Sequence, residues 1–197
     1  MGPSVDTGAI PADSTKMNVA LGNQSFLFMK KPFMYNKTMR IRIIAIGKIK
    51  EDYLKLGISE YLKRIKPYSE IEIIEVQDTP VPDSPSFAEI EKIKNIEGER
   101  VLKLLKNSDF VINLDMNCKE FLSEEFAGFL QKKMEIAGAF LTFVIGGSYG
   151  LSNDLKNRAN TSISLSKMTF LHQMTRLVLL EQIYRSFKIL NHETYHK

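Results

Sequence analysis

The chain has 197 residues, of which 44% are hydrophobic and 25% charged, and its formal net charge is +4. This length allows one domain, or one domain with a tail, and the composition is ordinary for a globular protein. A dedicated non-specific nucleic-acid binder would carry a much larger basic excess, so we expect any contact with RNA at a local patch.

Cys118 is the single cysteine, which excludes an internal disulfide framework and is natural in a reducing compartment, so we expect a cytoplasmic protein. The histidines are His172, His192 and His196, and together with one cysteine they show no metal-ligand spacing, so no metal is expected. No apolar stretch approaches the length of a membrane span, so no membrane association is expected either.

Residues 1–38 differ in composition from the rest of the chain. They are rich in Gly, Ser, Thr, Asn and Pro, and their one apolar cluster, 26–29, is too short for the core of a signal peptide. We interpret them as a vector-derived or mis-assigned leader, with the natural start at Met39; a targeting peptide is the alternative. We expect residues 39–197 to form one domain.

From Met39 onward, strand and helix patterns alternate. Apolar, β-branched or alternating runs predict strands, and 3.6-residue periodicity bounded by a proline or by the Ser86/Glu89 capping box predicts helices. The expected strands are 40–46, 70–76, 109–114, 139–145 and 162–165, and the expected helices are 52–66, 86–106, 123–136, 154–158 and 173–190. This order predicts an α/β fold with a mainly parallel sheet and helices on both faces.

Two of these strands end in small residues that expose the main chain. Strand 139–145 runs into Gly146 and Gly147, and strand 162–165 runs into a Ser-Lys-Met-Thr segment. Because open parallel sheets bind ligands at the carboxyl ends of their strands, we expect the site there. The glycines match neither the dinucleotide fingerprint nor the P-loop, and alone they indicate a tight turn, although glycine also lets a ligand approach the backbone.

The segment 165–170 follows a strand but contains no Gly, Pro or Asn. It is either a buried crossover connection or a nucleobase site, in which backbone groups would bind the edge of an adenine and Leu165, Met168 and Phe170 would cover its faces.

The last helix has a broad apolar face suited to core or dimer packing. The tail Tyr195-His196-Lys197 is either a frayed end or an aromatic ring, a base and a cation offered to a nucleotide.

Several motifs in a fixed order carry a family resemblance. They are MRIRIIAIGKIKEDY from Met39, EGERVL at 97–102, FVIGGSYGL, LSKMTFLHQMTRLVLLEQIYRSFKI and the closing YHK. Together they resemble the SPOUT class of S-adenosylmethionine-dependent RNA methyltransferases. More closely, they resemble the ribosomal large-subunit methyltransferase H family, which methylates N3 of a pseudouridine in large-subunit rRNA.

The resemblance implies a deep C-terminal trefoil knot, which is an exception to the rule that chains do not thread their loops. It also implies a homodimer. The S-adenosylmethionine pocket would comprise Leu114, Gly146, Leu165, Ser166, Lys167, Met168, Thr169 and Phe170.

On the acceptor side, the N3 proton must leave, so a base or an anion-stabilising cation would assist the transfer. We hypothesise that the catalytic residues are Tyr195 and His196, with Arg176 or His172, the tail reaching the partner's pocket. The family often has proline where Leu171 stands, which suggests a less rigid loop here.

The expected substrate is rRNA within the assembled ribosome, because a short domain without an RNA-binding module must borrow recognition from the ribosome surface. The alternatives are a SPOUT methyltransferase that acts on tRNA and a non-catalytic RNA- or ribosome-binding module.

Overall fold

The computed structural model describes residues 1–2, 40–137 and 140–195. The chain divides into two compact units, 1–31 and 32–197, and all the named elements lie in the second. The elements follow the predicted order: β1 (Arg40–Ile46), α1 (Asp52–Ile65), β2 (Glu70–Val76), α2 (Phe87–Leu102), β3 (Phe110–Lys119), α3 (Ser123–Ile136), β4 (Leu141–Ile145), α4 (Asn153–Arg158), β5 (Thr161–Ile163) and α5 (His172–Leu190). Among the described residues, no helix has the length and apolar character needed to cross a bilayer.

The five strands form one sheet in the order β2-β1-β4-β3-β5, and every pairing between neighbouring strands is parallel. The α/β fold class and the parallel sheet are therefore confirmed. Three strands have boundaries that differ from the prediction: β3, β4, which begins at Leu141, and β5. β3 continues past Leu114 to Lys119 through an irregularity in its pairing with β5, and β5 ends earlier, at Ile163. These boundaries depend on the partner strand, which local sequence does not reveal.

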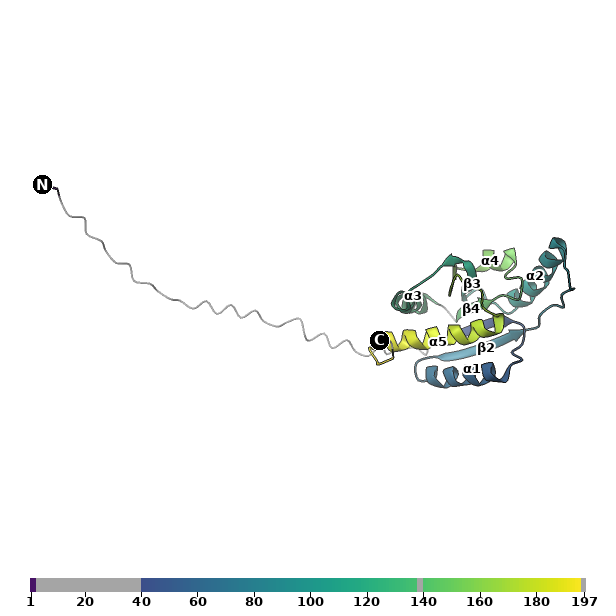
Figure 1. Ribbon diagram of the computed structural model, residues 1–197, viewed down its shortest axis with the longest axis horizontal. Coiled ribbons are helices and arrows are strands. Elements are labelled where there is room, and N and C mark those ends of the chain that lie inside the picture. The colour runs from purple at the N-terminus through teal and green to yellow at the C-terminus, as the bar shows by residue number, and fades with distance from the viewer. Residues whose placement is uncertain (3–39, 138–139, 196–197) are drawn as a thin grey trace. The chain divides into compact units, whose positions relative to one another are not determined.

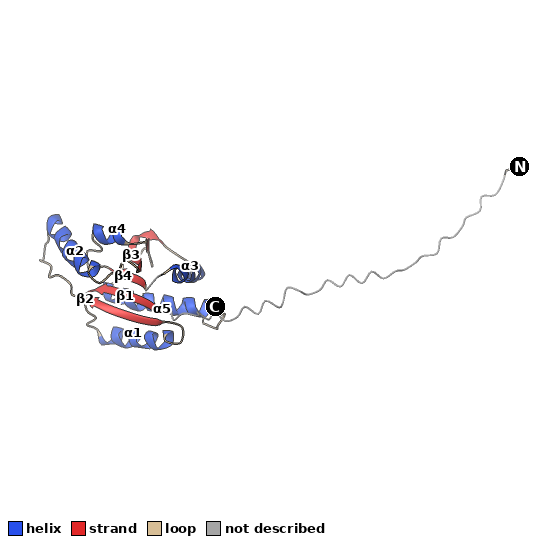
Figure 2. Ribbon diagram, turned by 180° about the vertical axis from the view of Figure 1, so that it is seen from behind, coloured by secondary structure: helices blue, strands red, loops and turns tan. Residues whose placement is uncertain are grey.

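Helices cover both faces of the sheet (Figures 1 and 2). On one face, Ile41, Ile43 and Ala45 pack with residues of α1, α3 and α5. On the other, Ile44 and Ile46 pack with residues of α2 and α4. Burial on both faces explains why residues 43–46 of β1 are all apolar and do not alternate with polar residues.

The sheet order determines where the segment between β5 and α5 must pass. β5 lies at one edge, beside β3, whereas the first residue of α5, His172, lies against Gly47, which follows β1. Residues 164–171 therefore cross the carboxyl ends of β3 and β4 before α5 begins. This crossing brings the segment together with the carboxyl ends of β1, β3 and β4.

The packing of α2 on α4 requires a glycine. A β-carbon added to Gly98 would lie 2.2 Å from the hydroxyl oxygen of Ser152. That hydroxyl accepts the Leu155 N–H at 3.3 Å and caps α4, so it cannot move without losing the cap. By contrast, a β-carbon on Gly128, in α3, would meet no atom within 4 Å.

We predict opposite effects of alanine at these two helical glycines. Gly98→Ala should lower the free energy of unfolding by about 1–3 kcal/mol because it overpacks the α2–α4 contact. Gly128→Ala should raise it by up to about 1 kcal/mol because alanine favours the helix and has room. Urea unfolding measures both, and equal effects of the two substitutions would contradict the packing described.

Candidate functional site

A cavity of about 560 Å³ lies at the carboxyl ends of β3 and β4. Its size suits a small-molecule ligand. Its walls come mainly from three stretches: 114–117 in the second half of β3, 145–151 at and after the end of β4, and the crossing segment with the start of α5. The same cavity is lined by Lys94 of α2 and Lys156 of α4.

Seven of the eight residues predicted for the donor pocket line this one cavity: Leu114, Gly146, Leu165, Ser166, Met168, Thr169 and Phe170. Lys167 does not line it, and its side chain is exposed. Of the four predicted catalytic residues, His172 lines the cavity, whereas Arg176 and Tyr195 do not. His196 lies outside the described residues.

Serine hydroxyls shape the crossing segment, which has no conventional turn residue. The Ser164 hydroxyl donates to the Ser166 carbonyl at 2.9 Å, and the Met168 N–H donates to the Ser166 hydroxyl at 3.0 Å. Such side-chain bonds mimic a backbone turn. The Thr169 hydroxyl lies 3.4 Å from the sulfur of Met116, which joins the segment to the extension of β3.

The glycine loop after β4 is closed on itself. Gly147 and Gly150 form an antiparallel bridge, with the Gly150 N–H donating to the Gly147 carbonyl at 3.0 Å. A β-carbon on Gly146 would lie 2.8 Å from the carbonyl carbon of Gly150, so only glycine fits without moving the backbone. Gly150 has a φ of +83°, which glycine tolerates. The glycines thus make the turn and leave the cavity wall bare.

Glu97, from the EGERVL motif, supports this loop from behind. Its side chain is buried, one carboxylate oxygen accepts the Thr79 N–H at 2.8 Å, and the other lies 2.7 Å from where a β-carbon on Gly147 would stand. Burial raises the pKa of Glu97, and Asp78 adds to this, whereas the Thr79 bond and Arg100 oppose it. Our sequence reasoning assigned Glu97 no role, although a buried glutamate within a motif is a usable signal.

Asp115 and Lys156 form an ion pair in the cavity wall, with 2.9 Å between the carboxylate oxygen and the ammonium nitrogen. Burial alone would raise the pKa of Asp115, but hydrogen bonds from the Asn117 N–H and from Lys156 outweigh it, so the pKa lies below its ordinary value. The carboxylate is therefore ionised at neutral pH. Sequence spacing gave no signal for this pair, because 41 positions separate the two residues.

Arg176 is fully buried and bonds only to protein groups. Its guanidinium donates to the carbonyls of Ile46 at 3.0 Å and Gly47 at 2.5 Å, and to the Glu75 carboxylate at 2.9 Å. One turn earlier, burial lowers the pKa of His172, and the charge of Arg176 adds to the effect. His172 is therefore neutral at pH 7. Arg176 is placed to position α5.

Leu171, where the family often has proline, precedes α5. Its φ is −57°, within the range that proline imposes, so the backbone follows a path that proline could also take.

Tyr195 lies far along α5 from the cavity. Its hydroxyl donates to the Glu181 carboxylate at 3.2 Å, and its ring packs edge-to-face on Tyr184 at 4.9 Å. Glu181 follows His172 by nine residues, an axial rise of about 13 Å. Burial raises the pKa of Tyr195. Within one chain, Tyr195 therefore does not meet His172 and Arg176.

Within the described ranges, no group of three or more His, Cys, Asp or Glu side chains could hold a metal ion. The polar groups that line the cavity include main-chain groups, the Asp115–Lys156 pair and His172.

We predict that Glu97→Gln reduces the pH dependence of stability. Because the pKa of Glu97 is raised above its ordinary value of 4.5, the folded state binds the proton more tightly than the unfolded state. The stability gained from this proton is complete below pH 4.5 and is lost as the pH rises through the folded pKa. Glutamine retains an acceptor for Thr79 but cannot ionise.

Urea unfolding from pH 4.5 upward should therefore show a smaller fall in the free energy of unfolding for Glu97→Gln than for the parent. The control is Glu99→Gln, on the exposed side of the same helix, which should behave like the parent. Parallel curves for all three proteins would contradict the assignment.

A family model described as predicted SPOUT methyltransferase matches residues 39–196. Over 159 residues, which are 81% of this chain and 100% of the relative, the chain is 52% identical to the ribosomal RNA large subunit methyltransferase H of Carboxydothermus hydrogenoformans. The proteins of that name from Acetivibrio thermocellus and Halothermothrix orenii are 52% and 49% identical, with the same coverage. From residue 39 to residue 196, this chain belongs to the SPOUT methyltransferase family.

Proposed function

We propose that this protein is an S-adenosylmethionine-dependent methyltransferase that modifies N3 of a pseudouridine in large-subunit rRNA on the assembled ribosome, with 39–197 as its single catalytic domain. One observation carries the proposal. In a chain 52% identical to a ribosomal RNA large subunit methyltransferase H, Leu114, Gly146 and most of 165–170 converge on one cavity. We propose a cytoplasmic location, because a ribosomal substrate would be met there.

The cavity suits the methyl donor. It is large enough for a nucleoside with a side chain, and its glycine wall has no β-carbon to obstruct a ligand. Leu165 and Phe170 offer apolar surface for an adenine, and the main chain of the crossing segment offers hydrogen-bonding groups for its edge. The donor supplies an activated methyl group, so the protein mainly has to align the acceptor.

For the acceptor, we propose His172 as the residue of the same chain that faces the bound nucleotide. Its lowered pKa leaves the imidazole neutral at pH 7, so one ring nitrogen can accept a proton. We propose Arg176 as a positioning residue that holds His172 at the cavity, because both terminal nitrogens of its guanidinium donate to Glu75 or to the end of β1 and the residue after it.

We further propose a homodimer in which the tail of one protomer, Tyr195 and His196, completes the cavity of the other. The separation of Tyr195 from its own cavity supports this arrangement. So does exposed apolar surface: Leu171, which lines the cavity, is 69% exposed, and Leu56 of α1 is 72% exposed. α1 and α5 are already in contact through Gly57 and Leu177, so a second copy could cover both.

We also propose that the C-terminal segment forms the family's trefoil knot. The path of 164–171 across the ends of β3 and β4, followed by the anchoring of α5 under the end of β1, supports this threading.

The test of donor binding is calorimetry with S-adenosylmethionine. Gly146→Ala should weaken binding at least about tenfold, equivalent to about 1.4 kcal/mol, because the new methyl group displaces the backbone of Gly150. Gly128→Ala, on an open helix surface, is the matched control and should bind like the parent. A parent protein that binds no donor would instead favour a non-catalytic ribosome-binding module.

The test of substrate and assembly is methyl transfer to large ribosomal subunits, whole ribosomes and isolated tRNA. Transfer to tRNA alone would overturn the rRNA assignment. Tyr195→Phe and His196→Ala should each slow the reaction if the tail acts on the acceptor. At a donor concentration too low to saturate the Gly146→Ala pocket, a mixture of His196→Ala and Gly146→Ala chains should react faster than either variant alone, because the mixed dimer contains one intact pocket facing one intact tail. No recovery would contradict a tail acting across the dimer.

A further inference from the structure

The loop after β1 is anchored rigidly beside the cavity. The Gly47 N–H donates to the Val76 carbonyl at 2.7 Å, the Ile49 N–H to Glu75 at 3.0 Å, and the Lys50 N–H to the Gln173 side chain at 2.9 Å. Since Arg176 also holds the Gly47 carbonyl, the loop is fixed to β2 and to the first turns of α5. Its position relative to the cavity is thereby set.

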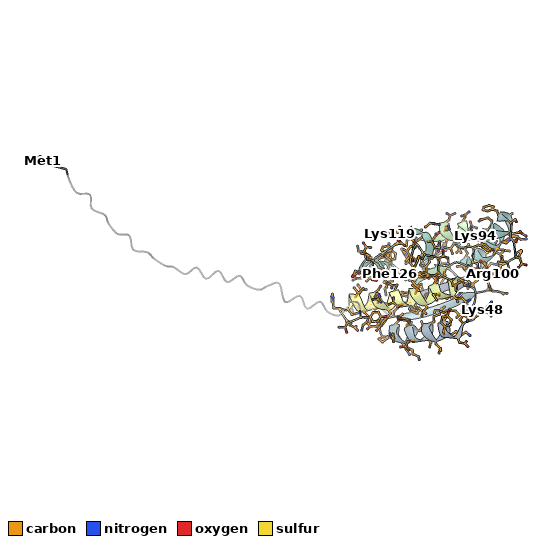
Figure 3. All side chains as sticks on the ribbon, viewed as in Figure 1. Met1, Lys48, Lys94, Arg100, Lys119 and Phe126 are labelled. Carbon is orange, nitrogen blue, oxygen red and sulfur yellow. The ribbon has the colours of Figure 1, made fainter. Side chains whose placement is uncertain are left out.

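This loop presents two lysines, Lys48 and Lys50, whose side chains are exposed. Figure 3 places Lys48 toward the end of the domain where α5 begins. Lys50 lies close enough to His172 for its charge to contribute to the lowered pKa of that histidine. Because His172 lines the cavity, the loop stands at the cavity's rim.

Neither Lys48 nor Lys50 has a carboxylate partner within the described residues. Among the described residues, several lysines are held by ion pairs: Lys55 with Asp52, Lys94 with Glu91, Lys156 with Asp115 and Lys188 with Glu193. No hydrogen bond or ion pair within the described residues holds the ammonium group of Lys48 or Lys50. Their charges are therefore available to an external anion.

Lys167 adds a third such charge from another part of the rim. It lies in the crossing segment, between residues that line the cavity, yet its own side chain is exposed and does not line it. Its neighbour Met168 is 71% exposed. The sequence resemblance assigned Lys167 to the donor pocket, but its exposure suits a ligand that lies over the rim.

We infer that Lys48, Lys50 and Lys167 form a cationic rim that binds the sugar-phosphate backbone of the RNA strand on either side of the nucleotide entering the cavity. This inference rests on the proposed function. Glu51 and Asp78 lie nearby, so the rim is not uniformly basic, but three lysines against two carboxylates leave a net positive charge.

RNA backbone is the ligand that this chemistry favours. Exposed ammonium groups on flexible stems bind phosphates as point charges, without sequence readout. A target base that must leave its stack brings its flanking phosphates to the rim of the pocket that receives it. The modest overall charge of +4 agrees with a contact limited to such a rim.

The test compares Lys48→Gln/Lys50→Gln and Lys167→Gln with a control pair, Lys103→Gln/Lys106→Gln. The control lysines are also exposed, but they lie between the end of α2 and the start of β3 and do not line the cavity. Methyl transfer to large subunits is measured as kcat and KM over a range of salt concentrations, and donor affinity is measured by calorimetry.

For Lys48→Gln/Lys50→Gln we expect an unchanged donor affinity and a KM raised by roughly tenfold. The slope of log affinity against log salt should fall by about 0.7 for each lysine removed. Lys167→Gln should show half of this slope change with an unchanged donor affinity. The control pair should match the parent.

The rim is overturned if the parent methylates large subunits but the variants keep its KM and salt slope, or if the control pair loses as much affinity. A weaker donor affinity in Lys167→Gln would show that Lys167 contributes to the donor pocket, and Lys167 would then no longer be assigned to the rim. Variants that bind a protein-free rRNA fragment as well as the parent, but bind whole subunits less tightly, would point to a ribosomal protein and also overturn it. If the parent transfers no methyl group to large subunits, the proposed function fails, but the cationic rim is not yet tested. In that case the affinities of the parent and the variants for the rRNA fragment are compared directly, and equal affinities overturn the rim.

Discussion

The position of α5 relative to the sheet depends on the buried guanidinium of Arg176. It joins three pieces of chain more than 100 residues away from it, the end of β1, the loop after it and Glu75 of β2. A charge with no exposed surface is stable only when such partners satisfy it, and removing one partner of a buried pair typically costs about 3–5 kcal/mol. Since α5 begins at this anchor, the segment that leads to it must cross the carboxyl ends of β3 and β4, and the cavity follows from that crossing.

The opposite wall of the cavity is held by a second close contact. Gly147 packs against the buried carboxylate of Glu97. Gly98, the next residue of the helix, has no side chain and so leaves room for the Ser152 hydroxyl that caps α4. The two residues of one motif therefore hold the glycine loop and the following helix together. A cavity wall made of main chain has no side chains that could change rotamer, so its geometry depends on the residues that pack against it.

The two ends of α5 are associated with different groups of residues. Its first turn supplies His172 to the cavity of its own chain, and its far end carries Tyr195, which packs on Tyr184 and Glu181. One helix cannot bring its two ends together, so a site that needs both must combine two chains. The proposed dimer and the proposed cationic rim address separate needs, since the tail would act on the base and the rim would hold the strand that carries it.

The sequence by itself determined the elements and the general place of the site. Strand runs such as 40–46, the capping box at Ser86 and the small residues at two strand ends act over a few neighbouring positions, and parallel strands bring their carboxyl ends to one edge. Only the tertiary structure decided which side chains meet there. Neither Lys167 nor Arg176 lines the cavity. Exposure and ion pairing depend on contacts between residues that lie about 40 to 130 positions apart, and local sequence does not specify such contacts.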